Sequence, residues 1–269
     1  MKYDPVKSRI GKIVGRSVWL RKIFYSLLDI LLLRTWHVKK AVRQFHRENE
    51  DARNILDAGS GFGQYSWRMW KINNNWNILG IDLKEEQVND CRHFISKTKA
   101  AGKVSFRTAD LTEFRKENQY DMILSVDVME HIEDDNRVFR NFHSSLRDQG
   151  RLIISTPSDR GGSDVHHEHD ESFIEEHVRD GYGMEEIEEK LRAAGFSSIE
   201  TSYTYGRPGS ISWRLSMKYP VIMLNTSMAF ALILPFYYIL VMPFALVLNY
   251  LDLRFKHSEG TGLLVKAKK

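Results

Sequence analysis

The stretch ILDAGSGFGQ occupies residues 55–64 and combines an apolar strand, an acidic residue and a glycine-rich turn that leads into a helix. Gly59, Gly61 and Gly63 let the backbone adopt conformations that a Cβ forbids and approach a ligand closely. The helix that follows has free N–H groups in its first turn, which bind a carboxylate or a phosphate. The dinucleotide fingerprint needs its third glycine where Gln64 stands, so the pattern argues against a dinucleotide.

Outward from this stretch, apolar segments of strand length alternate with amphipathic segments of helix length, over residues 54–205. This alternation is typical of an α/β fold, a parallel sheet with helices on both faces. We expect strands at Asn54–Asp57, Asn77–Asp82, Lys103–Arg107, Tyr120–Val126, Arg151–Thr156, Ser198–Tyr203 and Gly262–Lys268. We expect helices at Gln64–Ile72, Lys84–Lys99, Asp134–Leu146 and Met184–Ala194.

Composition and charge narrow the class of protein. The chain has 269 residues, 42% hydrophobic and 28% charged, which excludes the disordered and fibrous classes. Cys91 is the single cysteine, which excludes an intrachain disulfide and favours a reducing cytosol. Residues 1–47 carry twelve Lys or Arg and two Asp, a net charge of +10 that leaves −6 for the rest. The N-terminal region therefore favours an anionic surface.

An apolar segment with helical spacing lies at residues 18–33, between basic residues. It does not read as a signal peptide, because Asp29 interrupts the apolar run and no small-residue cleavage site follows. Two interpretations stay open, a helix that caps the sheet and a helix that contacts a membrane.

A second apolar segment, Tyr219–Leu251, has 33 residues without a charged side chain and is long enough for a transmembrane helix. A single span would separate two strands of one sheet, Ser198–Tyr203 and Gly262–Lys268, across the membrane. We therefore expect a shallow re-entrant or interfacial hairpin, broken near Pro235 and Pro243. The alternative is a hairpin buried in a homodimer interface or over the substrate pocket.

Two acidic residues follow the expected second and third strands. Asp82 comes 19 residues after Gly63, where a carboxylate accepts both ribose hydroxyl protons of a nucleoside cofactor. Asp110 is placed to accept from an adenine amino group, with the Leu111 amide near the ring. Taken with the glycine-rich turn, in one order along one sheet, the two acids predict a nucleoside-cofactor site.

These motifs resemble those of the class I S-adenosylmethionine-dependent methyltransferases, in particular the branch that includes ubiquinone-biosynthesis O-methyltransferases. The matching motifs are DAGSGFG (57–63), GIDL (80–83), TADL (108–111), YDMILSVDVMEHI (120–132) and LRDQGRLIISTP (146–157). The resemblance implies a Rossmann-like seven-stranded sheet whose last strand is antiparallel and lies beside the fifth. It also assigns cofactor-binding roles: Asp57, Gly59, Gly61 and Gly63 around the methionine moiety, Asp82 and Leu83 at the ribose, Asp110 and Leu111 at the adenine, and Asp127 in the wall near the sulfonium.

Three regions follow from this pattern. We expect a basic amphipathic N-terminal helical region at residues 1–50, and a methyltransferase domain at residues 51–206 plus 260–269. We expect a hydrophobic, membrane-associated helical hairpin at residues 207–259, inserted between the sixth and seventh strands.

A candidate metal site follows the fourth strand. Asp127, Glu130 and His131 stand at i, i+3 and i+4, which would put three metal-capable side chains on one face of a helical turn. The set resembles the E-x-x-E-H motif of Mg²⁺-dependent O-methyltransferases, with Asp127 in place of the first glutamate. His166 and His169, in the stretch HHEHD (166–170), are candidates for a further ligand or for a base. The candidate catalytic residues are therefore His131, Glu130, His166 and His169.

The predicted function is S-adenosylmethionine-dependent O-methylation of a hydrophobic small molecule or lipid, such as a quinone precursor, a phenolic or a polyene. We expect the protein to be cytoplasmic, peripheral or monotopic on the inner face of a membrane that contains anionic lipid. A nucleic-acid methyltransferase is the first alternative, disfavoured by the net acidic body and by the uncharged segment it leaves unexplained. A non-catalytic membrane-associated scaffold with the same fold is the second.

Overall fold

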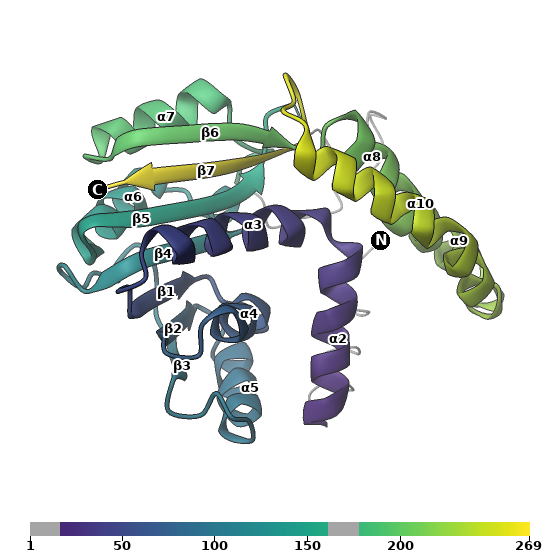
Figure 1. Cartoon of the computed structure of the whole chain (residues 1–269), viewed down its shortest axis with the longest axis horizontal. Helices are drawn as coiled ribbons and strands as arrows, with labels where there is room; N and C mark the ends of the chain where they lie inside the picture. The colour runs from purple at the N-terminus through teal and green to yellow at the C-terminus, as the bar shows by residue number, and fades with distance from the viewer. Residues whose placement is uncertain (1–16, 161–177) are drawn as a thin grey trace.

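The computed structural model describes residues 17–160 and 178–269, which form one seven-stranded sheet with helices on both faces (Figure 1). The strand order is β3-β2-β1-β4-β5-β7-β6. The strands are β1 (Asn54–Ala58), β2 (Asn77–Asp82), β3 (Val104–Thr108), β4 (Tyr120–Val126), β5 (Leu146–Pro157), β6 (Ser197–Thr204) and β7 (Gly262–Lys268).

Strand directions match the predicted fold class. β1 pairs in parallel with β2 and β4, and parallel pairing continues from β2 to β3 and from β4 to β5. β7 lies between β5 and β6 and is antiparallel to both, which confirms the expected position of the last strand. β5 begins at Leu146 rather than Arg151, because Leu146 already pairs with Tyr120 of β4 and is buried.

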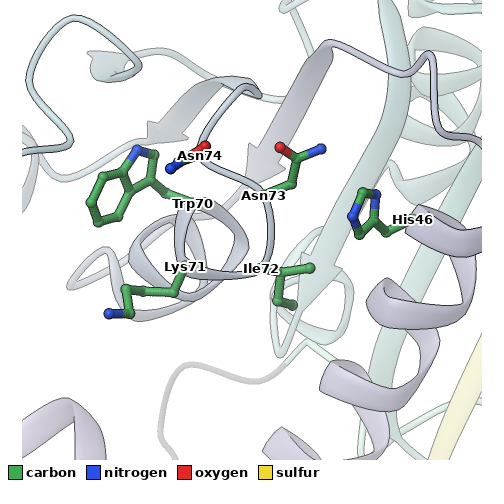
Figure 2. A pocket seen from close by; sticks show the side chains of 6 residues that line it. All are labelled: His46, Trp70, Lys71, Ile72, Asn73 and Asn74. Atoms are coloured by element: carbon green, nitrogen blue, oxygen red, sulfur yellow. The ribbon is translucent and has the colours of Figure 1, made fainter.

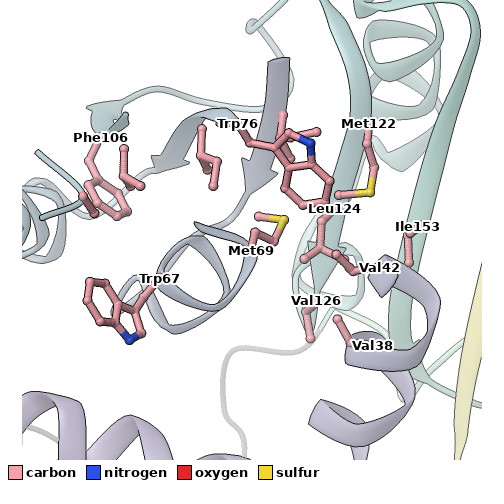
Figure 3. Packing of buried hydrophobic residues seen from close by; sticks show 14 of the residues in the cluster. Val38, Val42, Trp67, Met69, Trp76, Phe106, Met122, Leu124, Val126 and Ile153 are labelled. Atoms are coloured by element: carbon pink, nitrogen blue, oxygen red, sulfur yellow. The ribbon is translucent and has the colours of Figure 1, made fainter. Parts of the chain in front are cut away.

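Alternate residues of the strands supply two separate apolar cores, as the two-residue repeat of a strand requires. Ile55 faces the core shown in Figure 3, with Trp76 and Met122, whereas the next residue, Leu56, faces the other. The first face is covered by α3 (Leu33–Glu48), α4 (Gln64–Ile72) and α5 (Glu85–Ser96), and the second by α6 (Asp135–Ser145) and α7 (Met184–Ala193).

The N-terminal apolar segment is divided between two helices, α2 (Val18–Leu31) and α3, rather than one helix over residues 18–33. The chain bends at Leu32, whose extended backbone (ψ 107°) ends the first helix. Val38, Val42 and Phe45 of α3 pack into the first core, so α3 caps the sheet. α2 runs beside α4 and α5 (Figure 1), and its Tyr25 is buried in the first core.

Residues 207–254, which we call the apolar hairpin, connect β6 to β7 and project from the edge where the parallel strands end (Figure 1). The hairpin contains α8 (Arg207–Trp213), the π-helical turn η2 (Arg214–Lys218), α9 (Tyr219–Thr226), the 3₁₀ turn η3 (Met228–Leu232) and α10 (Leu234–Arg254). The chain reverses at Ser227–Ile233, which agrees with the break expected near Pro235, whereas the break expected near Pro243 is wrong because α10 continues through that residue. Pro235 lies in the first turn of α10, where proline costs no hydrogen bond, and Pro243 is accommodated inside this helix.

Candidate functional site

The glycine-rich turn forms an open backbone surface between β1 and α4. Gly59, Gly61 and Gly63 have φ values of 78°, 48° and 75°, a region that glycine adopts without strain. The Gly59 amide donates to the Ile81 carbonyl over 2.9 Å, which fixes the turn against β2. A Cβ built on Gly61 would meet only Gln87 Oε1, at 4.0 Å, so this residue faces open space that a ligand can fill.

Asp82, at the end of β2, is brought directly onto this turn. Its Oδ2 accepts a hydrogen bond from the Gly61 amide over 2.8 Å, and its Oδ1 accepts from the Lys84 amide over 3.0 Å. The carboxylate is therefore held rigidly beside the glycines. Leu83, the next residue, leaves a large apolar side chain exposed at this edge of the sheet.

The third motif lies beside the second. The Ala109 amide donates to the Asp82 carbonyl over 3.0 Å, which continues the β2–β3 pairing up to the neighbouring Asp110. Asp110 is exposed, and its Oδ1 accepts from the Thr112 amide and hydroxyl, both over 2.8 Å. Leu111 is buried in the second core. The glycine turn and both acidic residues thus occupy adjacent positions along one edge, although their contacts with a cofactor remain a prediction.

Asp57, the acidic residue of the glycine motif, is buried beneath the turn. Its carboxylate accepts from the Ser66 hydroxyl over 2.5 Å, which ties the end of β1 to the first turn of α4. Burial raises the pKa of Asp57 to about 7, and the nearby Asp82 carboxylate adds to this effect. Asp57 thus supports the turn from below, and its protonation is sensitive to positive charge placed above it.

Asp127 follows β4 in a left-handed conformation, with a φ of 51°. Its amide donates to the Ser155 carbonyl of β5 over 2.9 Å. Its carboxylate forms an ion pair with Arg34, from the first turn of α3. The backbone turn aims this carboxylate at the N-terminal region rather than along the turn that follows.

Of the candidate catalytic residues, Glu130 and His131 lie within the described ranges. Glu130 is buried and its Oε2 accepts from the Thr156 hydroxyl of β5 over 3.1 Å. Burial raises the pKa of the Glu130 carboxyl, and the hydrogen bond from Thr156 acts in the opposite direction. His131 closes the 3₁₀ turn η1 (Met129–His131). The predicted roles of His166 and His169 lie outside the described residues.

The predicted metal ligands do not form a ligand set. Within the two described ranges, no three His, Cys, Asp or Glu side chains gather closely enough to hold an ion. Asp127 precedes η1 and pairs with Arg34, whereas Glu130 bonds to Thr156. An i, i+3, i+4 set shares a face only in a continuous helix, and the left-handed Asp127 followed by a three-residue turn interrupts it. The prediction that Asp127, Glu130 and His131 hold Mg²⁺ is therefore not supported.

Tertiary structure adds residues that carry no recognisable motif. Arg34 donates its amide to the Tyr205 hydroxyl over 3.0 Å, and Thr35 lies 3.4 Å from the Tyr65 hydroxyl. Burial raises the pKa of both tyrosines, while the Arg34 charge acts in the opposite direction. Tyr65 follows β1 and Tyr205 follows β6, and this position after a strand was a weak indication of a role at the site. No local pattern in the sequence indicated a role for Arg34.

The N-terminal helix α2 also reaches the glycine turn. Arg21 Nη2 donates to the Phe62 carbonyl over 2.7 Å, and the Tyr25 hydroxyl donates to the same oxygen. Asp29 accepts from Gln64 Nε2 over 2.9 Å at the start of α4. A signal was present in the sequence, because Arg21, Tyr25 and Asp29 recur every four residues within a mainly apolar helix.

Two surface cavities lie away from this site. The first, of about 270 Å³, is lined by His46, Trp70, Lys71, Ile72, Asn73 and Asn74 (Figure 2). It opens where α4 ends, which is the opposite edge of the sheet from the glycine turn. The second, of about 300 Å³, is lined by residues of α5 and β3 and the loop between them. Neither touches Asp82 or the glycines, so the site is defined by the motifs.

Comparisons with known proteins identify the family to which this fold belongs. The family model described as "Methyltransferase domain" matches residues 49–198, more than half of the chain. The chain therefore belongs to this family, and its sheet is the S-adenosylmethionine-dependent methyltransferase fold that the motifs predicted.

The segment that matches this chain is only a part of each relative. The chain is 30% identical over 146 residues to a phosphoethanolamine N-methyltransferase of Triticum aestivum, covering 54% of this chain and 28% of that protein. It is 22% identical over 144 residues to the ubiquinone biosynthesis O-methyltransferase of Rickettsia bellii (strain OSU 85-389), covering 53% and 58%. The chain thus spans well under two thirds of either relative.

A solved structure shows the same fold with the cofactor bound. This is the Haemonchus contortus phosphoethanolamine N-methyltransferase 2 in complex with S-adenosyl-L-methionine, with a TM-score of 0.55 and 20% identity. The match covers 91% of this chain and 60% of that one. The open face of Gly61 beside the fixed Asp82 carboxylate fits such a nucleoside cofactor.

Proposed function

We propose that this protein methylates a hydrophobic acceptor, a lipid or a lipid-like phenol, while its apolar hairpin is inserted in one leaflet of a membrane. One observation carries the proposal: the exposed apolar hairpin, with no charged side chain over Tyr219–Leu251, projects from the same edge of the sheet as the cofactor motifs (Figure 1). An acceptor dissolved in the leaflet would therefore be close to the site of methyl transfer.

The exposed face of α10 is apolar. Phe236, Ile239, Leu240 and Phe244 are each 69–71% exposed, and their spacing of three or four residues places them on one face of the helix. A surface helix of a water-soluble protein exposes polar side chains along such a face, so this stripe favours apolar surroundings. Hydrocarbon supplies such surroundings.

Insertion to a limited depth fits the dimensions of α10. Among the described residues, α10 is the one helix long and apolar enough to cross a membrane, with a mean hydropathy of 1.7. Its C-terminal half, however, is attached to the domain, because Ala245, Asn249 and Asp252 are buried. Leu234–Phe244 remains outside the domain and extends roughly 16 Å. Since a bilayer core is about 30 Å thick, this length supports monotopic insertion into one leaflet.

Backbone groups in the hairpin have the internal partners that hydrocarbon demands. The Tyr237 and Tyr238 hydroxyls donate to carbonyls of the π-helical turn η2, Leu215 over 2.7 Å and Ser216 over 3.0 Å. At the tip, the Ser227 hydroxyl accepts from the Ala229 amide over 3.2 Å. These bonds occupy polar groups that the reversal of the chain and the irregular turn would otherwise expose.

The groups beside the cofactor motifs suit an acceptor that must lose a proton. S-adenosylmethionine supplies a methyl group on a sulfonium, which transfers in line to a nucleophile. Burial raises the pKa of Glu130, which makes this carboxylate a stronger base for the proton that the acceptor loses. Asp127 and Arg34 form the adjoining polar wall. The acceptor atom stays open, since the wheat relative is an N-methyltransferase and the Rickettsia relative an O-methyltransferase.

Incubation of a membrane lipid extract with the full-length protein and methyl-labelled S-adenosylmethionine tests the proposal. We expect mass spectrometry to find the label in an apolar product, and vesicle flotation to find the protein in the lipid fraction. The Phe236→Asp/Leu240→Asp variant should lose flotation and most of the lipid product while keeping cofactor affinity. Label that enters only water-soluble acceptors, with no flotation, would contradict the proposal.

A further inference from the structure

Helix α2 has its polar and apolar faces reversed relative to a helix of a water-soluble protein. Trp19, Ile23, Leu27 and Ile30 recur every three or four residues and form an exposed apolar stripe, with Trp19 68% exposed. Arg21, two positions from Trp19, lies about 200° away around the helix and is only 2% exposed. A surface helix normally hides its apolar stripe and exposes its charges.

The buried polar face is occupied by the cofactor turn. The Arg21 guanidinium and the Tyr25 hydroxyl both donate to the carbonyl of Phe62, between Gly61 and Gly63. Arg21 also donates to Asp90 Oδ2 of α5 over 2.5 Å, and its guanidinium stacks 4.7 Å from the centre of the Phe94 ring. The conformation of the glycine turn therefore depends on the position of α2.

A second contact links α2 to the helix that follows the turn. Asp29 accepts from Gln64 Nε2 over 2.9 Å and forms an ion pair with Arg68 over 2.5 Å. Arg21 and Asp29 are eight residues apart, slightly more than two helical turns. Contacts at both ends hold α2 along the glycine turn and α4 as one stiff element.

The charge of the N-terminal region and the position of α2 indicate which surface covers the exposed apolar stripe. The first 47 residues carry a net charge of +10, and Lys22 lies exposed beside the stripe, with its ammonium 5.3 Å from the Trp67 ring. Figure 1 shows α2 on the same side of the sheet as the apolar hairpin. Aromatic and aliphatic side chains next to basic ones are the composition of a helix that lies in the interface of an anionic bilayer.

We propose that α2 docks on an anionic bilayer through Trp19, Ile23, Leu27 and Ile30, and that docking tightens the cofactor turn through Arg21 and Tyr25. The proposal rests on the membrane insertion proposed above and adds a second contact with a different consequence. Because α2 touches lipid with one face and the Phe62 carbonyl with the other, lipid and cofactor binding are coupled. By linkage, each then raises the affinity of the other.

Calorimetry with S-adenosylhomocysteine tests the coupling, with and without vesicles of equal parts phosphatidylcholine and phosphatidylglycerol. We expect the vesicles to lower the Kd of the full-length protein by at least about fivefold. The Trp19→Ser/Leu27→Ser variant should keep the vesicle-free Kd and still float through its hairpin, but lose the vesicle effect. Phosphatidylcholine vesicles alone should produce a smaller effect.

A second variant tests the connection itself. Tyr25→Phe removes only the hydroxyl that donates to the Phe62 carbonyl and keeps the ring that packs 5.6 Å from the ring of Phe94. It should raise the vesicle-free Kd and reduce the vesicle effect without changing flotation. A circular dichroism spectrum equal to that of the parent would show that the helix is intact.

The outcomes separate this inference from the proposed function. Flotation with a Kd that vesicles leave unchanged would overturn the coupling and leave membrane insertion standing. A vesicle effect that survives in the Trp19→Ser/Leu27→Ser variant would also overturn it, because the lipid contact would then act through another element. No flotation of the parent protein would overturn both.

Discussion

Strand β4 and helix α10 are both strongly apolar, yet their surroundings are opposite. Ile123 of β4 is fully buried between two layers of helices, whereas Leu240 of α10 is exposed. The sheet is completed by the chain's own helices, so its apolar side chains have partners within the molecule. Those at the end of the hairpin have few partners within the described residues, and the proposed function covers them with lipid. Apolar composition therefore shows that a segment needs apolar contacts. Only the fold shows whether other parts of the chain provide those contacts.

The largest expected effect comes from the same substitution in the two regions. Ile123→Asp places a charge in the second core and should lower the free energy of unfolding by more than about 4 kcal/mol. Leu240→Asp should change it by less than about 0.5 kcal/mol but reduce vesicle partitioning at least about tenfold. Chemical denaturation and vesicle flotation measure the two quantities.

Equal destabilisation by the two substitutions would remove the distinction between the regions. It would mean that Leu240 is buried against protein in solution, as in a dimer interface, and sedimentation of the parent protein would then show the dimer.

Asp252 joins the two regions at the base of the hairpin. This fully buried carboxylate accepts from His37 Nε2 over 2.9 Å and from the Gly209 amide over 3.0 Å. Asp252→Ala leaves these donors unpaired and should cost about 3 kcal/mol of unfolding free energy, with loosening of α10 visible by hydrogen exchange. Asp148→Ala, at an exposed residue near the start of β5, is the matched control. A cost no greater than that of the control would show that the base is held mainly by apolar packing.

The substitution Asp82→Ala in the sheet region should change cofactor affinity rather than the packing of the core. The Asp82 carboxylate is fixed by the Gly61 and Lys84 amides, and we predict that it binds the cofactor ribose. Its removal should weaken S-adenosylhomocysteine binding by about 2 kcal/mol, or roughly thirtyfold. Calorimetry measures the loss, and Glu113→Ala in the loop after β3 serves as a control. Unchanged affinity would refute the assigned role of Asp82.

The smallest effect, when it is measured per pH unit, concerns the pH dependence of stability. The pKa of Asp57 is raised to about 7 from an ordinary 3.8, because burial disfavours the charged form. Between pH 4 and 7 the unfolded chain has lost this proton and the folded protein keeps it. The free energy of unfolding therefore falls as pH rises through this window, by up to about 1.4 kcal/mol per pH unit.

Asp57→Asn is neutral in both states and should remove that slope, while still accepting from Ser66. Denaturation curves across the window give the difference between the two proteins. A parallel slope in both would assign the pH dependence to other groups.

Local patterns predicted most of the sheet and the order of its motifs. β2, β4, β7 and α4 have the predicted boundaries, because each combines a clear apolar repeat with a glycine, proline or charged residue at its ends. Asp82 reaches the glycine turn as expected, since neighbouring parallel strands end at one edge. The predicted metal site is not supported in the described residues, because a left-handed residue, Asp127, interrupts the helical spacing on which the prediction depended.

The chain's sequence by itself determined the class of fold, the cofactor motifs and the need to cover two apolar segments, because these depend on repeats and residue types within short stretches. Only the tertiary structure decided that α2 turns Arg21 inward onto the glycine turn, that Arg34 meets Asp127, and that Asp252 anchors the hairpin beside the site. The reason is physical: each is a contact between groups distant in sequence, and the burial of a charge depends on which partner the rest of the fold brings to it.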